Sequence, residues 1–171
     1  MEKVTYSIED NENRYVIGIE RWEQSLLQQV GIEQSIEMYE VVLQRVAGDS
    51  MSSMRTLSVI AQYVYSFLKA HPKGVLYFFC DVHEIQRSKR HIALYPQEYR
   101  SQMFSALFDK VVCEQKINDI VNTKISLTTL EAEPAFIHLI TFTHNMEAVR
   151  ALEQQIRLQS KDDWQVDSCD N

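Results

Sequence analysis

The sequence predicts an α+β fold: a mixed, mainly antiparallel sheet with three main helices packed on it. Segments rich in β-branched and aromatic residues occur alongside segments whose apolar residues recur every three or four positions, and these two patterns indicate strands and helices respectively. The chain has only four glycines and three prolines, which disfavours a small barrel or sandwich with many tight turns. Its 171 residues, 45% of them hydrophobic, suffice for one domain with a buried core.

The first third of the chain is predicted to form strands. Residues 4–8, 15–22 and 36–46 are rich in β-branched and aromatic side chains, and the polar residues 9–13 suit a hairpin connection. Residues 23–35 are ambiguous. They fit either a short helix or part of a longer strand.

The middle of the chain is predicted to hold two helical regions around a strand. Residues 52–71 carry one apolar stripe at spacings of three and four, with serines at its start as caps. Residues 75–79 form a continuous apolar run, which predicts a strand buried on both faces. A second helical region is expected over residues 83–110. It is expected to break near Pro96, because proline disfavours helix at the residue before it.

The last third is predicted to form two paired strands and a helix. Residues 117–129 alternate between apolar and polar side chains, so one face of this strand is expected to be solvated. Residues 136–143 pair back on it, and residues 145–158 carry one apolar helical stripe. The element order is then β-β-β-α-β-α-β-β-α, in a single domain over residues 1–158. The acidic, aperiodic residues 159–171 are expected to form a flexible tail.

The stretch after the central apolar strand carries the strongest candidate site. Asp81 and Glu84 have the spacing of a capping box, in which both side chains bind backbone N–H groups of a first helical turn. On the predicted helix, two arginines and a histidine share the face opposite two isoleucines. This face is either the solvated side of an amphipathic helix or an anion site, since arginine binds phosphate and carboxylate bidentately. The candidate anion-binding residues are Arg87, Arg90, His91, Asp81 and His83.

Three other chemistries are weakly indicated in the same region. Cys80 and His83 have the residue types of a nucleophile and its base, but no further group is assigned to orient the base. Asp81, His83 and His91 offer ligand atoms without a recognised metal-binding spacing. The aromatic residues around Arg100 have the character of a base-stacking surface, although their helical spacing favours core packing. The sequence therefore predicts neither a metal nor a cofactor, and leaves catalytic residues unassigned.

The residues from the central strand onward resemble a small uncharacterised domain family of Bacteroides-type bacteria. The family pattern has an apolar strand, Cys-Asp, a helix with spaced arginines and then aromatic residues. The matching positions here are Cys80, Asp81, Arg87, Arg90, Tyr95 and Tyr99. Between the aspartate and the first arginine the family has a glycine, whereas this chain has "VHEIQ". The resemblance covers residues 4–156 and implies a shared fold, with no activity attached to it.

Charge is distributed unevenly along the chain, whose net charge is −7. Residues 1–49 carry four basic and ten acidic side chains, residues 50–110 eight and four, and residues 111–171 five and ten. This acidic balance disfavours bulk coating of nucleic acid and suits a basic protein partner. Three separated cysteines, without a recognisable signal peptide or an apolar segment of membrane length, predict a cytoplasmic protein with no membrane contact.

Two functions follow as hypotheses. The first is a non-enzymatic cytoplasmic protein-binding or accessory module of a bacterial or phage system. A homo-oligomer is compatible with this function. The alternative is a phosphate-directed protein that binds a nucleotide or nucleic acid, or acts on one. It would use the basic face of the helix after the central strand.

Overall fold

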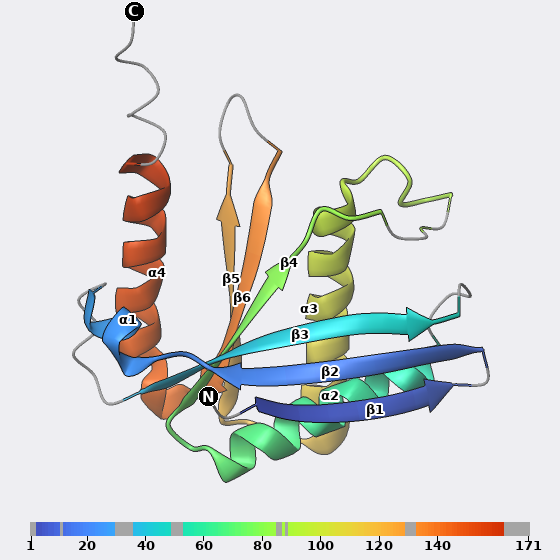
Figure 1. Cartoon of the computed structure of the whole chain (residues 1–171), viewed down its shortest axis with the longest axis horizontal. Helices are drawn as coiled ribbons and strands as arrows, with labels where there is room; N and C mark the ends of the chain where they lie inside the picture. The colour runs from blue at the N-terminus through green and yellow to red at the C-terminus, as the bar shows by residue number, and fades with distance from the viewer. Residues whose placement is uncertain are drawn as a thin grey trace, which may run out of the picture.

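The fold is a six-stranded sheet with helices on both faces (Figure 1). The computed structural model describes residues 3–10, 12–29, 36–48, 53–84, 87, 89–128 and 133–162. Its elements are β1 (Lys3–Asp10), β2 (Asn13–Arg21), α1 (Gln24–Gln29), β3 (Glu37–Ala47), α2 (Met54–Ala70), β4 (Gly74–Cys80), α3 (Pro96–Gln115), β5 (Ile120–Leu127), β6 (Ala135–Phe142), the 3-10 turn η1 (Thr143–Asn145) and α4 (Met146–Asp162). The strand order is β1-β2-β3-β4-β6-β5, and among the strands that the structure describes only β3 and β4 pair in parallel. The predicted α+β class with a mixed, mainly antiparallel sheet and three main helices is confirmed.

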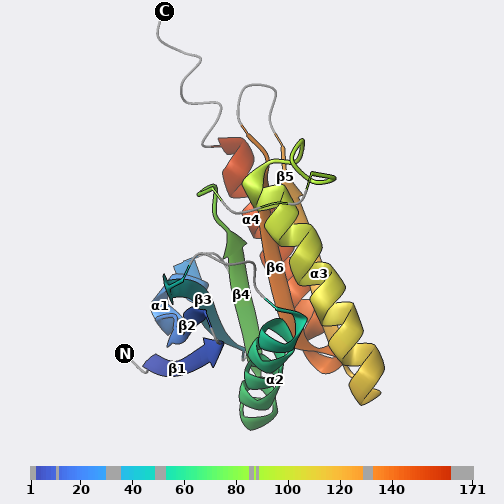
Figure 2. The same cartoon turned by 90° about the vertical axis from the view of Figure 1, so that its right-hand side faces the viewer.

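Two hydrophobic cores lie on opposite faces of the sheet. α2 and α3 pack on one face, where buried residues such as Ile17, Leu68 and Leu76 form the first core. α1 and α4 contribute to the second core on the other face, with Leu27, Val149 and their neighbours. Figure 2 shows α2 and α3 in front of β4 and β6, with α4 behind them. Every strand of the sheet's centre therefore separates two apolar layers.

Local signals set the ends of the two helices that cover the first core. Ser53 caps α2, because its side-chain oxygen accepts the N–H of Thr56 at 3.1 Å. Pro96 begins α3, a position where its missing N–H has no cost. Lys116 ends α3 in the left-handed conformation, with φ 52°. These signals fix where the helices start and stop.

The sheet divides where β3 and β4 separate. Their parallel ladder joins only Glu37–Glu40 to Gly74–Tyr77, although β3 runs on to Ala47 and β4 to Cys80. Beyond the ladder, β3 stays paired with β2 and β4 with β6, and the two arms turn away from each other (Figure 1). Because right-handed twist rotates neighbouring strands, a short ladder lets the two arms diverge. The sheet is therefore a fork that opens at the carboxyl ends of its parallel pair.

The predicted helix over residues 83–95 is wrong. The described residues between β4 and α3 form bends and turns, and the helix begins only at Pro96. Asp81 therefore caps no helix: its carboxylate accepts the N–H of His83 at 2.8 Å in a local turn. The Arg100 guanidinium on α3 donates to the carbonyls of Asp81 and His83, at 2.9 and 2.6 Å. These bonds hold the segment as a loop, so neither the predicted capping box with Glu84 nor the predicted basic helix face exists.

Other boundaries differ less from the prediction. The ambiguous segment after β2 contains the short helix α1, and α4 continues to Asp162, beyond the predicted end of the domain at residue 158. Residues 163–171, most of the predicted tail, lie outside the described residues. The predicted burial of β4 on both faces holds for Val75 and Leu76, but Phe79 is 44% exposed, because it lies past the ladder with β3. Among the described helices, none is both long and apolar enough to cross a membrane.

Candidate functional site

A cavity of about 780 Å³ lies in the fork of the sheet. We call it the cleft. Its walls are residues 40–45 of β3, residues 78–79 of β4, and the facing sides of α2 and α3. Its volume falls in the range of roughly 300–1,000 Å³ that is typical of binding pockets. Its position at the carboxyl ends of a parallel pair is also where ligands commonly bind in open sheets.

The cleft meets β3 at the edge of the strand. Six consecutive residues, Glu40 to Arg45, line it. Side chains alternate between the two faces of a strand, so a cavity on one face would touch every second residue. Contact with consecutive residues therefore means that the backbone edge of β3 borders the cleft.

The interior of the cleft is apolar. Leu57, Ile60 and Val64 line it from α2, and Met103 and Phe104 from α3, together with further apolar residues. The ring of Phe104 stacks on Phe78 of β4, with centroids 4.6 Å apart and planes 13° apart. An apolar interior of this size binds best to a group that is itself apolar, because burial of apolar surface stabilises the complex.

Ion pairs stand at the rim of the cleft with their acidic ends outward. The guanidinium of Arg100 lies 3.5 Å from the Asp81 carboxylate, and that of Arg87 lies 2.9 Å from Glu84. The two arginine side chains are only 17% and 12% exposed, whereas the Glu84 side chain is 80% exposed. The positive groups are thus held inside and the carboxylates face solvent, which favours a positively charged group at this rim.

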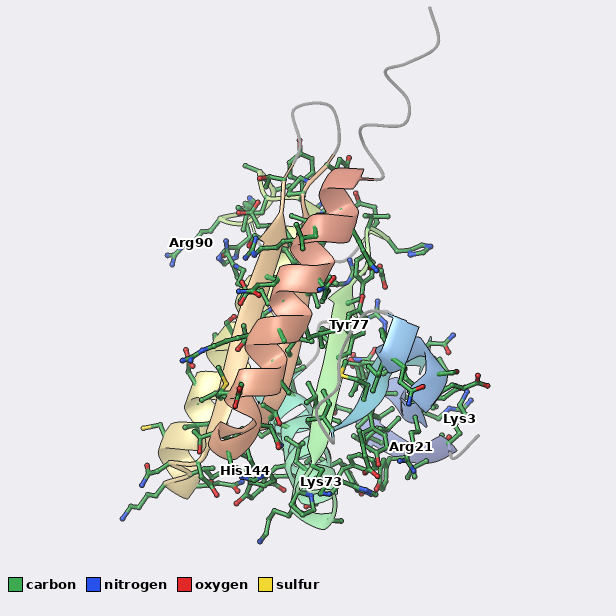
Figure 3. All side chains as sticks on the ribbon, turned by 90° about the vertical axis from the view of Figure 1, so that its left-hand side faces the viewer. Lys3, Arg21, Lys73, Tyr77, Arg90 and His144 are labelled. Atoms are coloured by element: carbon green, nitrogen blue, oxygen red, sulfur yellow. The ribbon has the colours of Figure 1, made fainter. Side chains whose placement is uncertain are left out.

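Of the predicted anion-binding residues, the structure brings Asp81 and His83 together, with the His83 ring 3.2 Å from the Asp81 carboxylate. Asp81 and His83 lie at the rim of the cleft. Arg87 is committed to Glu84 and also donates to the carbonyl of Leu94 at 2.7 Å. The exposed Arg90 points away from the molecule (Figure 3). The ring of His91 lies against Tyr99, with centroids 5.3 Å apart.

The other chemistries considered for this region were a cysteine nucleophile with a histidine base, and a metal site. Cys80 is fully buried, and burial raises the pKa of its thiol to about 12. It is therefore protonated at neutral pH, whereas the thiolate is the nucleophile. The ring of His83 lies 3.2 Å from Asp81 and is exposed. Over the described part of the chain, no three His, Cys, Asp or Glu side chains cluster in a way that could hold a metal ion.

A second polar cluster was not predicted from the sequence. Ser101 Oγ lies 2.9 Å from His138 Nε2, and His138 Nδ1 lies 3.0 Å from Asn122 Oδ1. Burial, with a smaller contribution from the charge of Lys124, lowers the pKa of His138 to about 4. The neutral ring then accepts from the serine hydroxyl and donates to the asparagine carbonyl.

This cluster has the residue types of a hydrolytic triad but the surroundings of a structural one. Ser101 and His138 are both fully buried, and neither lines the cleft. The ring of Phe104 lies between His138 and the cleft side, with its centroid 4.7 Å from the imidazole. A substrate therefore has no path to the hydroxyl in this structure. The cluster joins α3 to β6 and β5, and its three members are too far apart in sequence to be recognised there.

Sequence reasoning also missed the cleft itself. β3 was predicted as a strand, yet its outer half borders a cavity because of where its ladder with β4 ends. The signals present were the apolar residues Val42 and Phe79, which are exposed in the structure. No protein-family model matches this chain, and neither does any curated protein sequence. The resemblance described above stays a prediction.

Proposed function

We propose that the protein is a non-enzymatic, cytoplasmic protein-binding module whose binding site is the cleft. The observation that carries this proposal is an apolar cavity of about 780 Å³ bordered by a strand edge. Protein-binding sites combine an apolar centre with a polar rim. Here the centre is the α2 and α3 lining, and the rim holds the outward-facing carboxylates of Asp81 and Glu84.

Exposed apolar residues at the cleft support binding rather than simple packing. Val42 is 50% exposed and Phe79 is 44% exposed, and both border the cleft. Exposed apolar groups gathered at a cavity are typical of interaction sites, while single scattered ones are not informative. Leu158 on α4 is an example of the second kind, since it is exposed and does not line the cleft.

The catalytic alternative is less well supported by the same contacts. The thiol of Cys80 is protonated at neutral pH, and Ser101 and His138 are closed to solvent. The phosphate-directed alternative is weakened because Arg87 and Arg100 already bind groups of this chain. An incoming phosphate would have to displace those bonds before it gained any.

A peptide-selection experiment tests the proposal. A randomised peptide library displayed on phage is selected on the immobilised protein, and the enriched peptides are measured by fluorescence polarisation. Phe79→Glu, which places a charge where β4 borders the cleft, is expected to weaken binding at least tenfold. Leu158→Glu is the matched control, because Leu158 is similarly exposed but lies on α4, and circular dichroism confirms that both variants are folded.

Two results would argue against the proposal. One is a selection that enriches no peptide over unmodified phage. The other is enrichment of peptides that bind wild type and Phe79→Glu equally, since their site would then lie elsewhere.

A further inference from the structure

We infer that the partner segment binds in extended conformation and adds a strand to the free edge of β3. This inference rests on the proposed function above and specifies its partner. The segment would carry alternating apolar side chains, with a lysine or arginine at the end that reaches the rim of the cleft. Strand addition obtains affinity from main-chain hydrogen bonds and specificity from pockets for alternate side chains.

The direction of the β3 backbone groups follows from two hydrogen bonds at its start. The N–H of Glu37 donates to the carbonyl of Lys73 at 3.0 Å, on the β4 side. The carbonyl of Met38 accepts the N–H of Trp22 at 2.9 Å, on the β2 side. Because successive residues of a strand point their backbone groups to opposite sides, odd-numbered residues of β3 face β4 as far as the bulge that separates the pairs Tyr15–Arg45 and Arg14–Ala47.

β3 also has odd-numbered residues beyond the point where it separates from β4. The ladder with β4 ends at the pair of Glu40 and Tyr77, while the ladder with β2 continues to Ala47. The N–H and C=O of Leu43 therefore point into the cleft, and within the described residues no ladder bond to another strand reaches them on that side. An unpaired strand edge of this kind is a template for a further strand.

The length of the free edge suits a short segment. From residue 41 to Gln44 the strand extends about 10 Å, at roughly 3.3 Å per residue, and beyond it the register with β2 shifts at a bulge. A segment of about four residues would cover it. This length is ordinary for a strand in a globular protein.

Side-chain positions on the free edge explain the apolar requirement. Val41 belongs to the core under α2 and Leu43 packs against that core, so side chains of an added strand on the same face would enter the apolar cleft. Side chains on the other face would lie beside Val42, which is 50% exposed. An exposed valine on an unpaired edge is unfavourable unless a partner covers it.

The charges at the rim of the cleft are the reason why the segment would carry a lysine or arginine. Asp81 and Glu84 present their carboxylates outward, while the arginines that pair with them are largely buried. A lysine or arginine near one end of the segment would approach these carboxylates. The net charge of −7 on the whole chain acts in the same direction.

Two substitutions at Leu43 test the backbone bond separately from the side chain. Leu43→Ala removes only the side chain. Leu43→Pro also removes the N–H that faces the cleft, but leaves the ladder with β2 because that N–H points away from β2. For a peptide enriched in the selection above, the proline variant is expected to bind about three- to tenfold more weakly than the alanine variant, the range for one hydrogen bond. A thermal melt confirms that both variants fold.

Hydrogen exchange of the wild-type protein gives a readout that does not depend on folding of a variant. The Leu43 amide should exchange at least tenfold more slowly when the enriched peptide is bound. Amides of β3 that face β2 serve as the control, because they are already protected in the free protein. The enriched peptides should contain lysine or arginine and lack aspartate and glutamate.

Each other outcome has a definite meaning. Peptides that bind as helices, seen by circular dichroism, with no change at the Leu43 amide would overturn strand addition while protein binding stands. Equal binding by the proline and alanine variants would do the same. Enrichment of acidic peptides would overturn the basic requirement. If the protein alone forms a dimer in sedimentation and its Leu43 amide is then protected, the occupant is a second copy, which overturns a foreign segment. A selection that enriches nothing counts against the proposed function itself.

Discussion

Lowering the pH from 7 to 5 is predicted to destabilise the fold through His138. This histidine is fully buried and bonded to Ser101 and Asn122, and its pKa falls from the ordinary value of 6.5 to about 4. Between these two values the unfolded chain binds a proton that the folded chain excludes. The free energy of unfolding therefore rises with pH inside this window and falls as the pH is lowered through it.

The expected loss follows from the two pKa values. Each pH unit inside the window changes the free energy of unfolding by about 1.4 kcal/mol. Between pH 7 and pH 5 the contribution of His138 is then about 2 kcal/mol, because most of this interval lies below 6.5. Above the unfolded pKa both states are neutral, and His138 contributes no pH dependence there.

Urea denaturation at pH 7 and pH 5, followed by circular dichroism, measures this loss. His138→Gln keeps one donor and one acceptor without titrating in this range, so its loss between the two pH values should be about 2 kcal/mol smaller than that of wild type. The reasoning is refuted if His138→Gln loses as much stability as wild type over this interval.

Three further predictions concern residues around the cleft. Fluorescence anisotropy with labelled nucleic acid should detect no salt-sensitive binding that is lost in the Arg87→Ala/Arg90→Ala variant, because Arg87 already bonds to Glu84 and to the carbonyl of Leu94. Salt-sensitive binding that this variant loses would restore the anion-site hypothesis. Arg100→Ala should speed exchange of the loop amides after β4 and cost about 1–3 kcal/mol, since two charged hydrogen bonds are lost; unchanged exchange would contradict this. A thiol reagent at pH 8 should label the exposed Cys113 but not the buried Cys80; rapid labelling of both in the folded protein would show that the Cys80 site opens.

Elements with a strong local pattern were predictable from the sequence. The stripe that predicts a helix over residues 52–71 corresponds to α2, and the alternation over residues 117–129 contains β5. Such patterns work because the period of the side chains is a property of the element itself. The hairpin of β1 and β2 was predictable for the same reason, since its partners are neighbours in the chain.

The prediction of a helix over residues 83–95 was wrong because the conformation of that segment depends on a residue of another element, Arg100 of α3. The candidate residues Arg87, Arg90 and His91 were placed on one face by helical periodicity alone. In the structure Arg100 holds the carbonyls of Asp81 and His83 in a loop. Bonds from a side chain of another element to these carbonyls compete with the helical ladder, and this competition is visible only in three dimensions.

The sequence by itself determined the fold class, the number of main helices and most strand positions. Only the tertiary structure decided where the sheet divides, and therefore that a cleft exists beside β3. Only the tertiary structure brings Ser101 of α3 within hydrogen-bond distance of His138 of β6. The physical reason is that periodicity is local, whereas a ladder's end and a buried hydrogen bond depend on contacts between residues far apart in the chain.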